Sequence, residues 1–185
     1  MIKVNEAAKL GAKRLKLMVF DIDGVMSEGS LIYSDKGVEL KAFFAPDGIG
    51  LRMLQKAGIT LAIITGRKSR CVALRAQDLG IEHVYQGIAN KLDSFEHLLS
   101  KLNINADAAG FMGDDIIDVE VMSLCAFAAA PADCQERVKN YAQFISRHNG
   151  GRGAVREVCE FILDAQGKLD RALADYLPKP KQVQV

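Results

Sequence analysis

Two aspartates, Asp21 and Asp23, stand directly after a run of apolar residues and precede Gly24. The apolar run at 15–20 is typical of a strand buried on both faces of a parallel sheet. Its acids would then lie at the carboxyl edge of that sheet, where open α/β folds bind their ligands. Two carboxylates held there repel each other by several kcal/mol at an intermediate effective dielectric constant. We therefore expect a cation beside them, or a proton on one of them.

Other predicted strand ends carry polar residues that suit phosphate chemistry. Thr65 offers a hydroxyl and a backbone N–H beside Gly66 to phosphoryl oxygens, although a lone Thr-Gly pair is more often a turn. Lys91 opens a predicted helix, where a cation is unfavourable unless an anion binds beside it, although most lysines are simply solvated. The run 113–118 adds acids at another strand end, where acids are often mere helix caps. Each signal is weak alone, and their combination indicates a phosphate site.

Strand and helix patterns alternate along most of the chain. Strands are predicted at residues 59–64, 83–85, 108–112, 125–129 and 144–145, and helices at 48–56, 69–79, 91–102, 116–123, 133–139 and 154–166. Strands separated by helices of about ten residues indicate βαβ units with right-handed crossovers. The sequence therefore predicts an α/β fold with a doubly wound parallel sheet, in a single domain over residues 1–185.

The remaining segments are short. We expect Asp47 to cap the helix at 48–56. Val4, Ala7, Ala8 and Leu10 stand at near-helical spacing, so residues 1–14 could form a short helix that leans on the domain, although a frayed lead-in is the favoured prediction. Residues 177–185, which contain Pro178 and Pro180, are predicted to form an extended or mobile end.

Residues 28–44 contain two β-prone runs around Ser34-Asp35-Lys36-Gly37, which predicts a β-hairpin insertion with Gly37 at positive φ. In the second run Val38, Leu40 and Ala42 alternate with charged residues, so one face of the strand is apolar. A two-stranded hairpin is not stable alone in water. Its apolar face must therefore rest on this domain or on another subunit.

The composition argues against several classes of protein. The chain has 24 basic and 23 acidic residues, a formal net charge of +1, and no basic stripe with interleaved aromatic residues, so nucleic acid is not an expected partner. Residues 1–14 carry several charges and no continuous apolar core, so we expect neither a signal peptide nor a membrane span. The cysteines lack a C-x-x-C spacing and are interpreted as buried thiols: Cys71, Cys125, Cys134 and Cys159. These features predict a cytoplasmic protein.

In their order along the chain, the motifs resemble those of the haloacid dehalogenase superfamily. The matching residues are Asp21-Ile22-Asp23-Gly24-Val25, Thr65-Gly66-Arg67, Lys91 and Gly113-Asp114-Asp115-x-x-Asp118. The interval between the first two motifs is too short for the large cap domain of many members, and leaves only the hairpin. The chain is thus similar to the small capless phosphatases of the superfamily that act on phosphorylated sugar acids, and the resemblance implies a Rossmann-like core.

The resemblance also implies a Mg²⁺-dependent phosphatase that works through an aspartyl phosphate. Asp21 is the implied nucleophile, and Asp23 the implied general acid and then general base. Thr65 and Lys91 are implied to hold the transferring group and neutralise its charge.

Mg²⁺ is implied to bind Asp21, the backbone carbonyl of Asp23, and Asp114, because magnesium prefers hard oxygen ligands. Asp115 and Asp118 are then expected to orient the waters of the metal or Lys91. The expected substrate-binding residues are Asp23, Thr65, Gly66, Arg67, Arg75 and Lys91. Among these, Arg67 and Arg75 are candidates to bind a sugar-acid carboxylate by paired hydrogen bonds.

Two alternatives fit the same motifs. The same motifs could serve another phosphorylated sugar or a nonulosonic acid, because fold and chemistry do not fix the substrate. A response-regulator receiver, which is a phosphorylated switch, also combines clustered aspartates, Mg²⁺, a Thr and a Lys on a doubly wound sheet. A receiver carries its phosphoacceptor on a middle strand, whereas Asp21 and Asp23 share the first, which favours the enzyme.

A homo-oligomer, and a tetramer as in the resembling phosphatases, is the expected working unit. A capless core leaves its acids open to water, and phosphate binding alone does not distinguish one sugar phosphate from another. Hairpins packed together from several subunits would cover their apolar faces and place a wall over the neighbouring active site. In the alternative, each hairpin folds onto its own domain.

Overall fold

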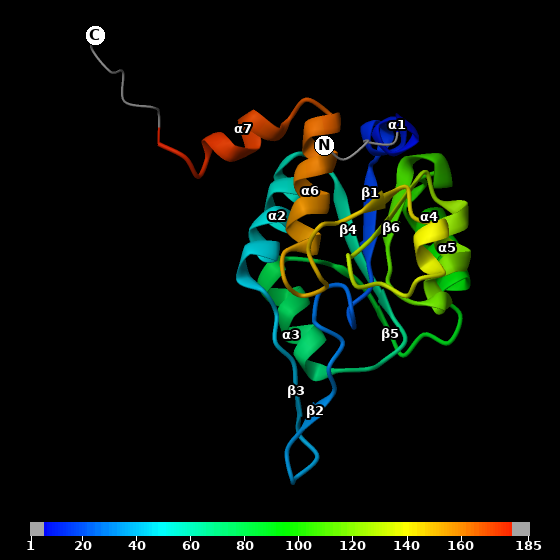
Figure 1. Ribbon diagram of the computed structural model, residues 1–185, viewed down its shortest axis with the longest axis vertical. Coiled ribbons are helices and arrows are strands. Elements are labelled where there is room, and N and C mark those ends of the chain that lie inside the picture. The colour runs from blue at the N-terminus through cyan, green and yellow to red at the C-terminus, as the bar shows by residue number, and fades with distance from the viewer. Residues whose placement is uncertain (1–5, 179–185) are drawn as a thin grey trace.

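A parallel sheet of six strands, in the order β5-β4-β1-β6-β7-β8, forms the centre of the computed structural model, which describes residues 6–178 (Figure 1). The strands are β1 Leu17–Phe20, β4 Thr60–Thr65, β5 His83–Gln86, β6 Ala109–Met112, β7 Phe127–Ala130 and β8 Phe144–Ile145. From β1 the chain moves outward to β4 and β5, returns to β6 on the other side, and continues to β7 and β8. The doubly wound prediction is therefore confirmed, and the order reverses beside β1, where such folds bind ligands.

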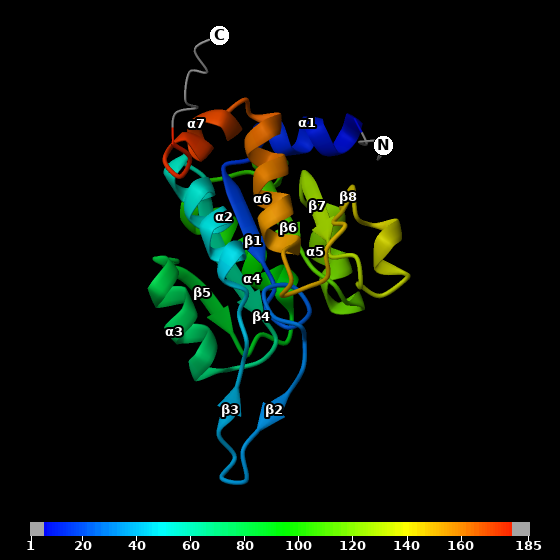
Figure 2. The ribbon, with the colours of Figure 1, turned by 60° about the vertical axis from the view of Figure 1, so that its left-hand side comes forward.

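Helices cover both faces of this sheet (Figure 1 and Figure 2). They are α1 Glu6–Arg14, α2 Ala45–Lys56, α3 Arg70–Leu79, α4 Lys91–Leu102, α5 Val119–Leu124, α6 Ala154–Ala165 and α7 Leu169–Ala174, with 3₁₀ turns at Ala106–Ala108, Ile116–Asp118 and Val138–Asn140. One apolar core joins the sheet to α1, α2, α3 and α6, and a second joins it to α4 and α5. None of the helices within residues 6–178 is long and apolar enough to cross a membrane.

The central strand β1 shows why its sequence lacks alternation. Leu17 and Val19 point into the core on the α4 side, and Met18 and Phe20 into the core on the α2 side. All four side chains are fully buried, because a strand inside a parallel sheet has helices on both faces. The strand stops at Asp21, so this acid emerges at the carboxyl edge.

The predicted hairpin consists of β2 Ile32–Tyr33 and β3 Glu39–Leu40, joined through a turn in which Gly37 has a φ of 72°. It projects from the body of the domain beyond the carboxyl edge of the sheet (Figure 2). Ile32 pairs with Leu40, and Tyr33 pairs with Glu39. No large cap domain is present among the described residues, in agreement with the short interval between the first two motifs.

The favoured prediction of a frayed lead-in at 1–14 is wrong from Glu6 onward, where the alternative, a short helix leaning on the domain, is observed. Helix α1 buries Ala8, Gly11 and Ala12, and a methyl group added at Gly11 would lie only 2.1 Å from the carbonyl oxygen of Ala126. Small residues on one face let this helix lie directly against the chain that leads into β7. Residues 1–5 of that prediction, and residues 179–185 of the predicted tail, lie outside the described part of the chain.

The predicted cap at Asp47 is also wrong. Phe44 is the N-cap of α2, and Asp47 lies buried within the first turn. Its Oδ1 accepts a hydrogen bond of 2.8 Å from the backbone N–H of Arg156 in the first turn of α6. Asp47 therefore caps the neighbouring helix, a tertiary contact with no local signal in the sequence.

The C-terminal third differs from the prediction in two places. The helix expected at 133–139 is replaced by turns and the 3₁₀ turn at Val138–Asn140, and the backbone of this segment does not bond only within itself. The backbone N–H of Gln135, for example, donates to the carbonyl of Asp114 at 2.9 Å. Helix α7 was not predicted, and it packs Leu169 and Leu173 against the α6 side of the core.

Candidate active site

Asp21, Lys91 and Asp118 form a buried network of ion pairs at the carboxyl edge of the sheet. The Nζ atom of Lys91 lies 2.8 Å from Asp21 Oδ2 and 2.6 Å from Asp118 Oδ1. Asp21 follows β1, Lys91 is the first residue of α4, and Asp118 ends a 3₁₀ turn after β6. Three segments far apart in the sequence thus place two acids and one base at a single point.

Asp118 also fixes the loop that carries Asp114. Its Oδ2 accepts hydrogen bonds from the backbone N–H groups of Asp114, at 3.1 Å, and Asp115, at 3.2 Å. Asp115 in turn accepts a hydrogen bond of 2.7 Å from the N–H of Ile116 and so caps the 3₁₀ turn. A side chain at Gly24 would lie 2.1 Å from Asp114 Oδ2, so only glycine lets the two loops approach this closely.

The negative charge of the acids in this cluster exceeds the positive charge that Lys91 supplies. Carboxylate oxygens of Asp21, Asp114 and Asp118 lie within 4.8 Å of one another. Burial raises the pKa of Asp114 to about 8, and repulsion by Asp21 adds to the effect. Burial likewise raises the pKa of Asp21 to about 6, although Lys91 opposes the shift.

The same cluster fits a magnesium ion. Asp21 Oδ1 and Asp114 Oδ1 are buried and have no hydrogen-bond partner among residues 6–178. Both are hard oxygen donors, the type that Mg²⁺ prefers, and a divalent cation would relieve the repulsion between the carboxylates. The expected ligands Asp21 and Asp114 therefore lie together, and Asp118 lies beside them.

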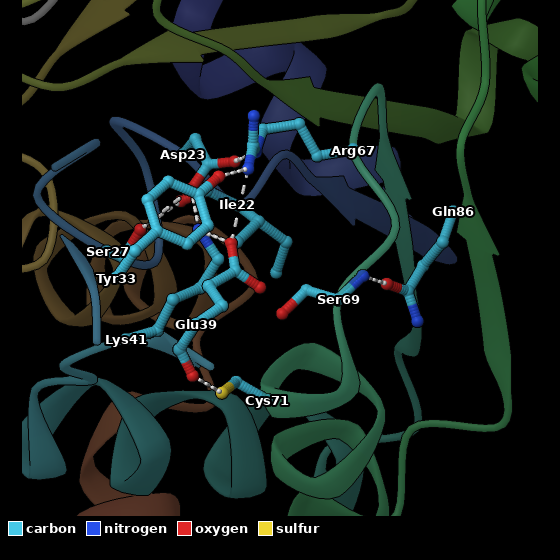
Figure 3. A network of polar contacts seen from close by, with 10 residues as sticks. All are labelled: Ile22, Asp23, Ser27, Tyr33, Glu39, Lys41, Arg67, Ser69, Cys71 and Gln86. Atoms are coloured by element: carbon cyan, nitrogen blue, oxygen red, sulfur yellow. Dashed lines mark hydrogen bonds and ion pairs between the residues drawn. The ribbon is translucent and has the colours of Figure 1, made fainter. Parts of the chain in front are cut away.

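The carboxylate of Asp23 contacts a different set of donors (Figure 3). Lys41 forms an ion pair with Oδ1, and the hydroxyl of Ser27 donates to the same oxygen at 3.4 Å. The Nε atom of Arg67 lies 3.6 Å from Oδ2. Asp21 and Asp23 are two residues apart in sequence, yet separate basic groups hold them, so the two acids can take different roles.

The polar face of the hairpin meets Arg67 (Figure 3). The Nη2 atom of Arg67 donates to the hydroxyl of Tyr33 at 2.5 Å and to Glu39 Oε1 at 3.4 Å. Glu39 also lies 3.6 Å from Lys41 Nζ. Tyr33, Glu39 and Lys41 were not predicted to be site residues. The alternation of charged and apolar residues in the second strand of the hairpin is a signal that points to Glu39 and Lys41.

The other residues expected at the site divide into two groups. Thr65 is buried at the end of β4 and is followed by the exposed Gly66, at the same edge as Asp21. Arg75, by contrast, packs at the start of α2. Its guanidinium lies 5.7 Å from the centre of the Phe43 ring, and its Nε is buried without a hydrogen-bond partner in the described chain. The role of Arg75 in substrate binding stays a prediction.

A cavity of about 410 Å³ opens beside the acid cluster. Its lining is mainly acidic: Asp23, Gly24, Glu28, Gly29, Ser30, Asp114, Asp115 and Asp133. Such a surface repels an anionic substrate unless a bound cation reverses the local charge. The cavity therefore supports a cation as part of the working site.

This edge of the sheet carries the groups needed for phosphoryl transfer through a carboxylate, and residues 81–158 match the model of the haloacid dehalogenase-like hydrolases. The chain belongs to the haloacid dehalogenase-like hydrolases. The names of its relatives within this family also state a substrate. The 3-deoxy-D-manno-octulosonate 8-phosphate phosphatase KdsC of Escherichia coli K12 is 46% identical over 161 residues, which cover 87% of this chain and 86% of that protein.

Solved structures agree with this relationship. The 3-deoxy-D-manno-octulosonate 8-phosphate phosphatase of Moraxella catarrhalis, in complex with a magnesium ion, a phosphate ion and a KDO molecule, has a TM-score of 0.91 at 41% identity and covers 94% of this chain and 99% of its own. The phosphatase of the same name from Yersinia pestis has a TM-score of 0.88 at 42% identity and covers 89% of each chain.

Proposed function

We propose that this protein is a Mg²⁺-dependent phosphatase that hydrolyses 3-deoxy-D-manno-octulosonate 8-phosphate. The observation that carries the reaction type is the pairing of Asp21 with Lys91 while Asp23 binds separate donors. The names of the relatives and the ligands of the Moraxella catarrhalis structure support the substrate.

Asp21 is the nucleophile of this reaction. One of its oxygens forms a bond to phosphorus while the bond from phosphorus to the sugar oxygen breaks, and an aspartyl phosphate results. Lys91 Nζ, at 2.8 Å from Asp21, orients the carboxylate and is placed to neutralise charge on the phosphoryl oxygens. Thr65 supplies a hydroxyl from the neighbouring strand end.

Asp23 transfers the protons. It protonates the sugar oxygen as that oxygen leaves, and then accepts a proton from the water that attacks the aspartyl phosphate. Because Asp23 does not share Lys91 with Asp21 in the described contacts, it can change protonation state without disturbing the nucleophile.

Asp21, Asp114 and the backbone carbonyl of Asp23 would hold Mg²⁺. When bound, the ion neutralises part of the charge of the carboxylates and of the phosphoryl group. Asp118 keeps Lys91 and the Asp114 loop in place through its two oxygens.

The sugar-acid carboxylate is a partner for Arg67, whose guanidinium is partly exposed above Asp23. A planar guanidinium matches a carboxylate with two parallel hydrogen bonds. Glu39 holds this arginine at 3.4 Å, so substrate binding would replace or share that contact. Arg75 and Gly66 complete the proposed substrate-binding set.

A homo-oligomer, with a tetramer as the expected size, is also part of this proposal. Val38 and Leu40 are 57% and 54% exposed, and Ile32, the partner of Leu40, is 48% exposed. The hairpin thus contacts its own domain through polar residues and leaves its apolar face for a neighbour, which would complete the active site.

The four cysteines are free thiols, which supports the cytoplasm as the compartment. Cys125, Cys134 and Cys159 are buried as predicted, whereas Cys71 is partly exposed.

Phosphate release from 3-deoxy-D-manno-octulosonate 8-phosphate by the purified protein tests the proposal. We expect many turnovers per chain with Mg²⁺, none after chelation, and recovery when Mg²⁺ is added back. Asp21→Asn should abolish turnover. Stoichiometric phosphorylation without release would instead identify a switch, and faster turnover of another phosphorylated sugar would overturn the substrate while keeping the reaction.

A further inference from the structure

Lys41 directly follows strand β3 of the hairpin, and its charged group contacts Asp23, the proposed general acid. Its side chain is 1% exposed, although its neighbours Leu40 and Ala42 are exposed. Its Nζ forms an ion pair with Asp23 Oδ1 and lies 3.6 Å from Glu39 Oε1. A lysine buried to this degree loses hydration and is tolerated only with acidic partners. The burial of Lys41 therefore depends on its contact with Asp23.

The contacts of Asp23 define the orientation of its carboxylate. Lys41 and Ser27 hold Oδ1, while Arg67 Nε lies 3.6 Å from Oδ2. Ser27 is a weak restraint at 3.4 Å, and Arg67 is the residue that a sugar acid would engage. Lys41, whose contact with Asp23 is drawn in Figure 3, is therefore the stronger of the two restraints on Asp23 that do not compete with the substrate.

We propose that Lys41 is a positioning residue for Asp23, which it holds so that the carboxyl group meets the leaving sugar oxygen. This inference rests on the proposed function. In the assisted step an Asp21 oxygen bonds to phosphorus, the bond from phosphorus to the sugar oxygen breaks, and that oxygen takes the proton from Asp23. Lys41 keeps its own protons and touches neither phosphorus nor the leaving oxygen.

The effect of losing Lys41 should depend on the leaving group. A sugar alkoxide needs a proton as it leaves, whereas p-nitrophenolate leaves without one. A misplaced catalytic group costs up to about 10²-fold, and general acid catalysis contributes about 10²- to 10⁴-fold in total. We expect Lys41→Met to lower kcat/KM for the sugar phosphate by about 10- to 100-fold, and that for p-nitrophenyl phosphate by less than about 3-fold.

The test measures kcat/KM for both substrates, and for a simple alkyl phosphate, with the wild type, Lys41→Met, Asp23→Asn and the double variant. The value of kcat/KM reports steps up to departure of the leaving group, so hydrolysis of the aspartyl phosphate does not obscure it. If Lys41 acts through Asp23, Lys41→Met has no further effect in the Asp23→Asn background. Lys41→Arg, which keeps the charge, should recover part of the loss.

Lys36→Met is the matched control, because Lys36 is exposed in the turn of the same hairpin. It should leave the three kcat/KM values unchanged. An equal loss of kcat/KM for aryl and sugar phosphates in Lys41→Met, or losses that multiply in the double variant, would overturn the inference. A wild type that hydrolyses aryl and alkyl phosphates but not 3-deoxy-D-manno-octulosonate 8-phosphate would overturn the proposed substrate alone, since the Lys41 comparison then uses the alkyl phosphate.

Discussion

Replacing Asp118 with alanine should lower the stability of the fold more than the same substitution at any exposed acid of this loop. Asp118 is fully buried, its Oδ1 pairs with Lys91 at 2.6 Å, and its Oδ2 accepts two backbone hydrogen bonds. Asp118→Ala therefore leaves a buried ammonium with a single partner and two N–H groups without their acceptor.

The magnitude follows from these contacts. Removal of one member of a buried ion pair costs about 3–5 kcal/mol. Two effects place Asp118→Ala near the lower end: Lys91 keeps Asp21 at 2.8 Å, and the repulsion that Asp118 exerts on Asp21 and Asp114 disappears. We expect a loss of about 3 kcal/mol in the free energy of unfolding, or roughly 6–12 °C in Tm for a chain of this size.

Urea unfolding of the chelated protein, followed by circular dichroism, measures this change. Asp115→Ala is the control, because it removes only a cap of the same 3₁₀ turn and should cost about 1 kcal/mol. Asp118→Asn keeps the shape but not the charge and should fall between the two. An Asp118→Ala variant as stable as Asp115→Ala would refute the reasoning that this buried network supports the loop.

Asp23→Asn should still allow attack by Asp21 but lower sugar phosphate turnover by about 10²- to 10⁴-fold, measured as phosphate release; near-normal turnover would exclude Asp23 as the acid. Burial raises the pKa of Asp114 from 3.8 to about 8. Between these two pH values Asp114 holds a proton in the chelated folded protein but not in the unfolded chain, so its contribution to stability falls as the pH rises through that window. Mg²⁺ binds ionised carboxylates, so it should raise Tm more at about pH 8 than at about pH 6; equal shifts would contradict this. Charged substitutions at Val38 and Leu40 should produce monomers in sedimentation that lose sugar selectivity but keep some aryl phosphatase activity, and a fully active, selective wild-type monomer would refute the proposed assembly.

The central part of the fold was predictable because each strand and helix has a strong local pattern. The helix predicted at 91–102 and the strand at 144–145 have the observed bounds. The errors occur where long-range contacts decide. Helix α1 packs Gly11 against Ala126, and the segment at 133–139 donates a backbone hydrogen bond from Gln135 to Asp114. Neither contact has a signature within a short window of sequence.

The site was predictable to the extent that strand ends converge. Asp21, Lys91 and Asp114 stand next to predicted strands or helices, and the topology brings all of them to one edge. Lys41 and Glu39 are different, because their position depends on how the hairpin leans on the domain. The sequence showed that the hairpin has two faces, but only the structure shows that the polar face meets Asp23 and Arg67.

The two faces of the hairpin connect assembly to chemistry. Val38 and Leu40 alternate with Glu39 and Lys41 along one strand, so any neighbour that packs on the apolar residues also restrains the charged ones. The hairpin contains a single pair of two-residue strands, and such a pair is not stable alone in water. An assembled chain would therefore hold Lys41 against Asp23 more firmly than an isolated one. On this reasoning, loss of the oligomer should affect proton transfer to the sugar oxygen more than the attack by Asp21.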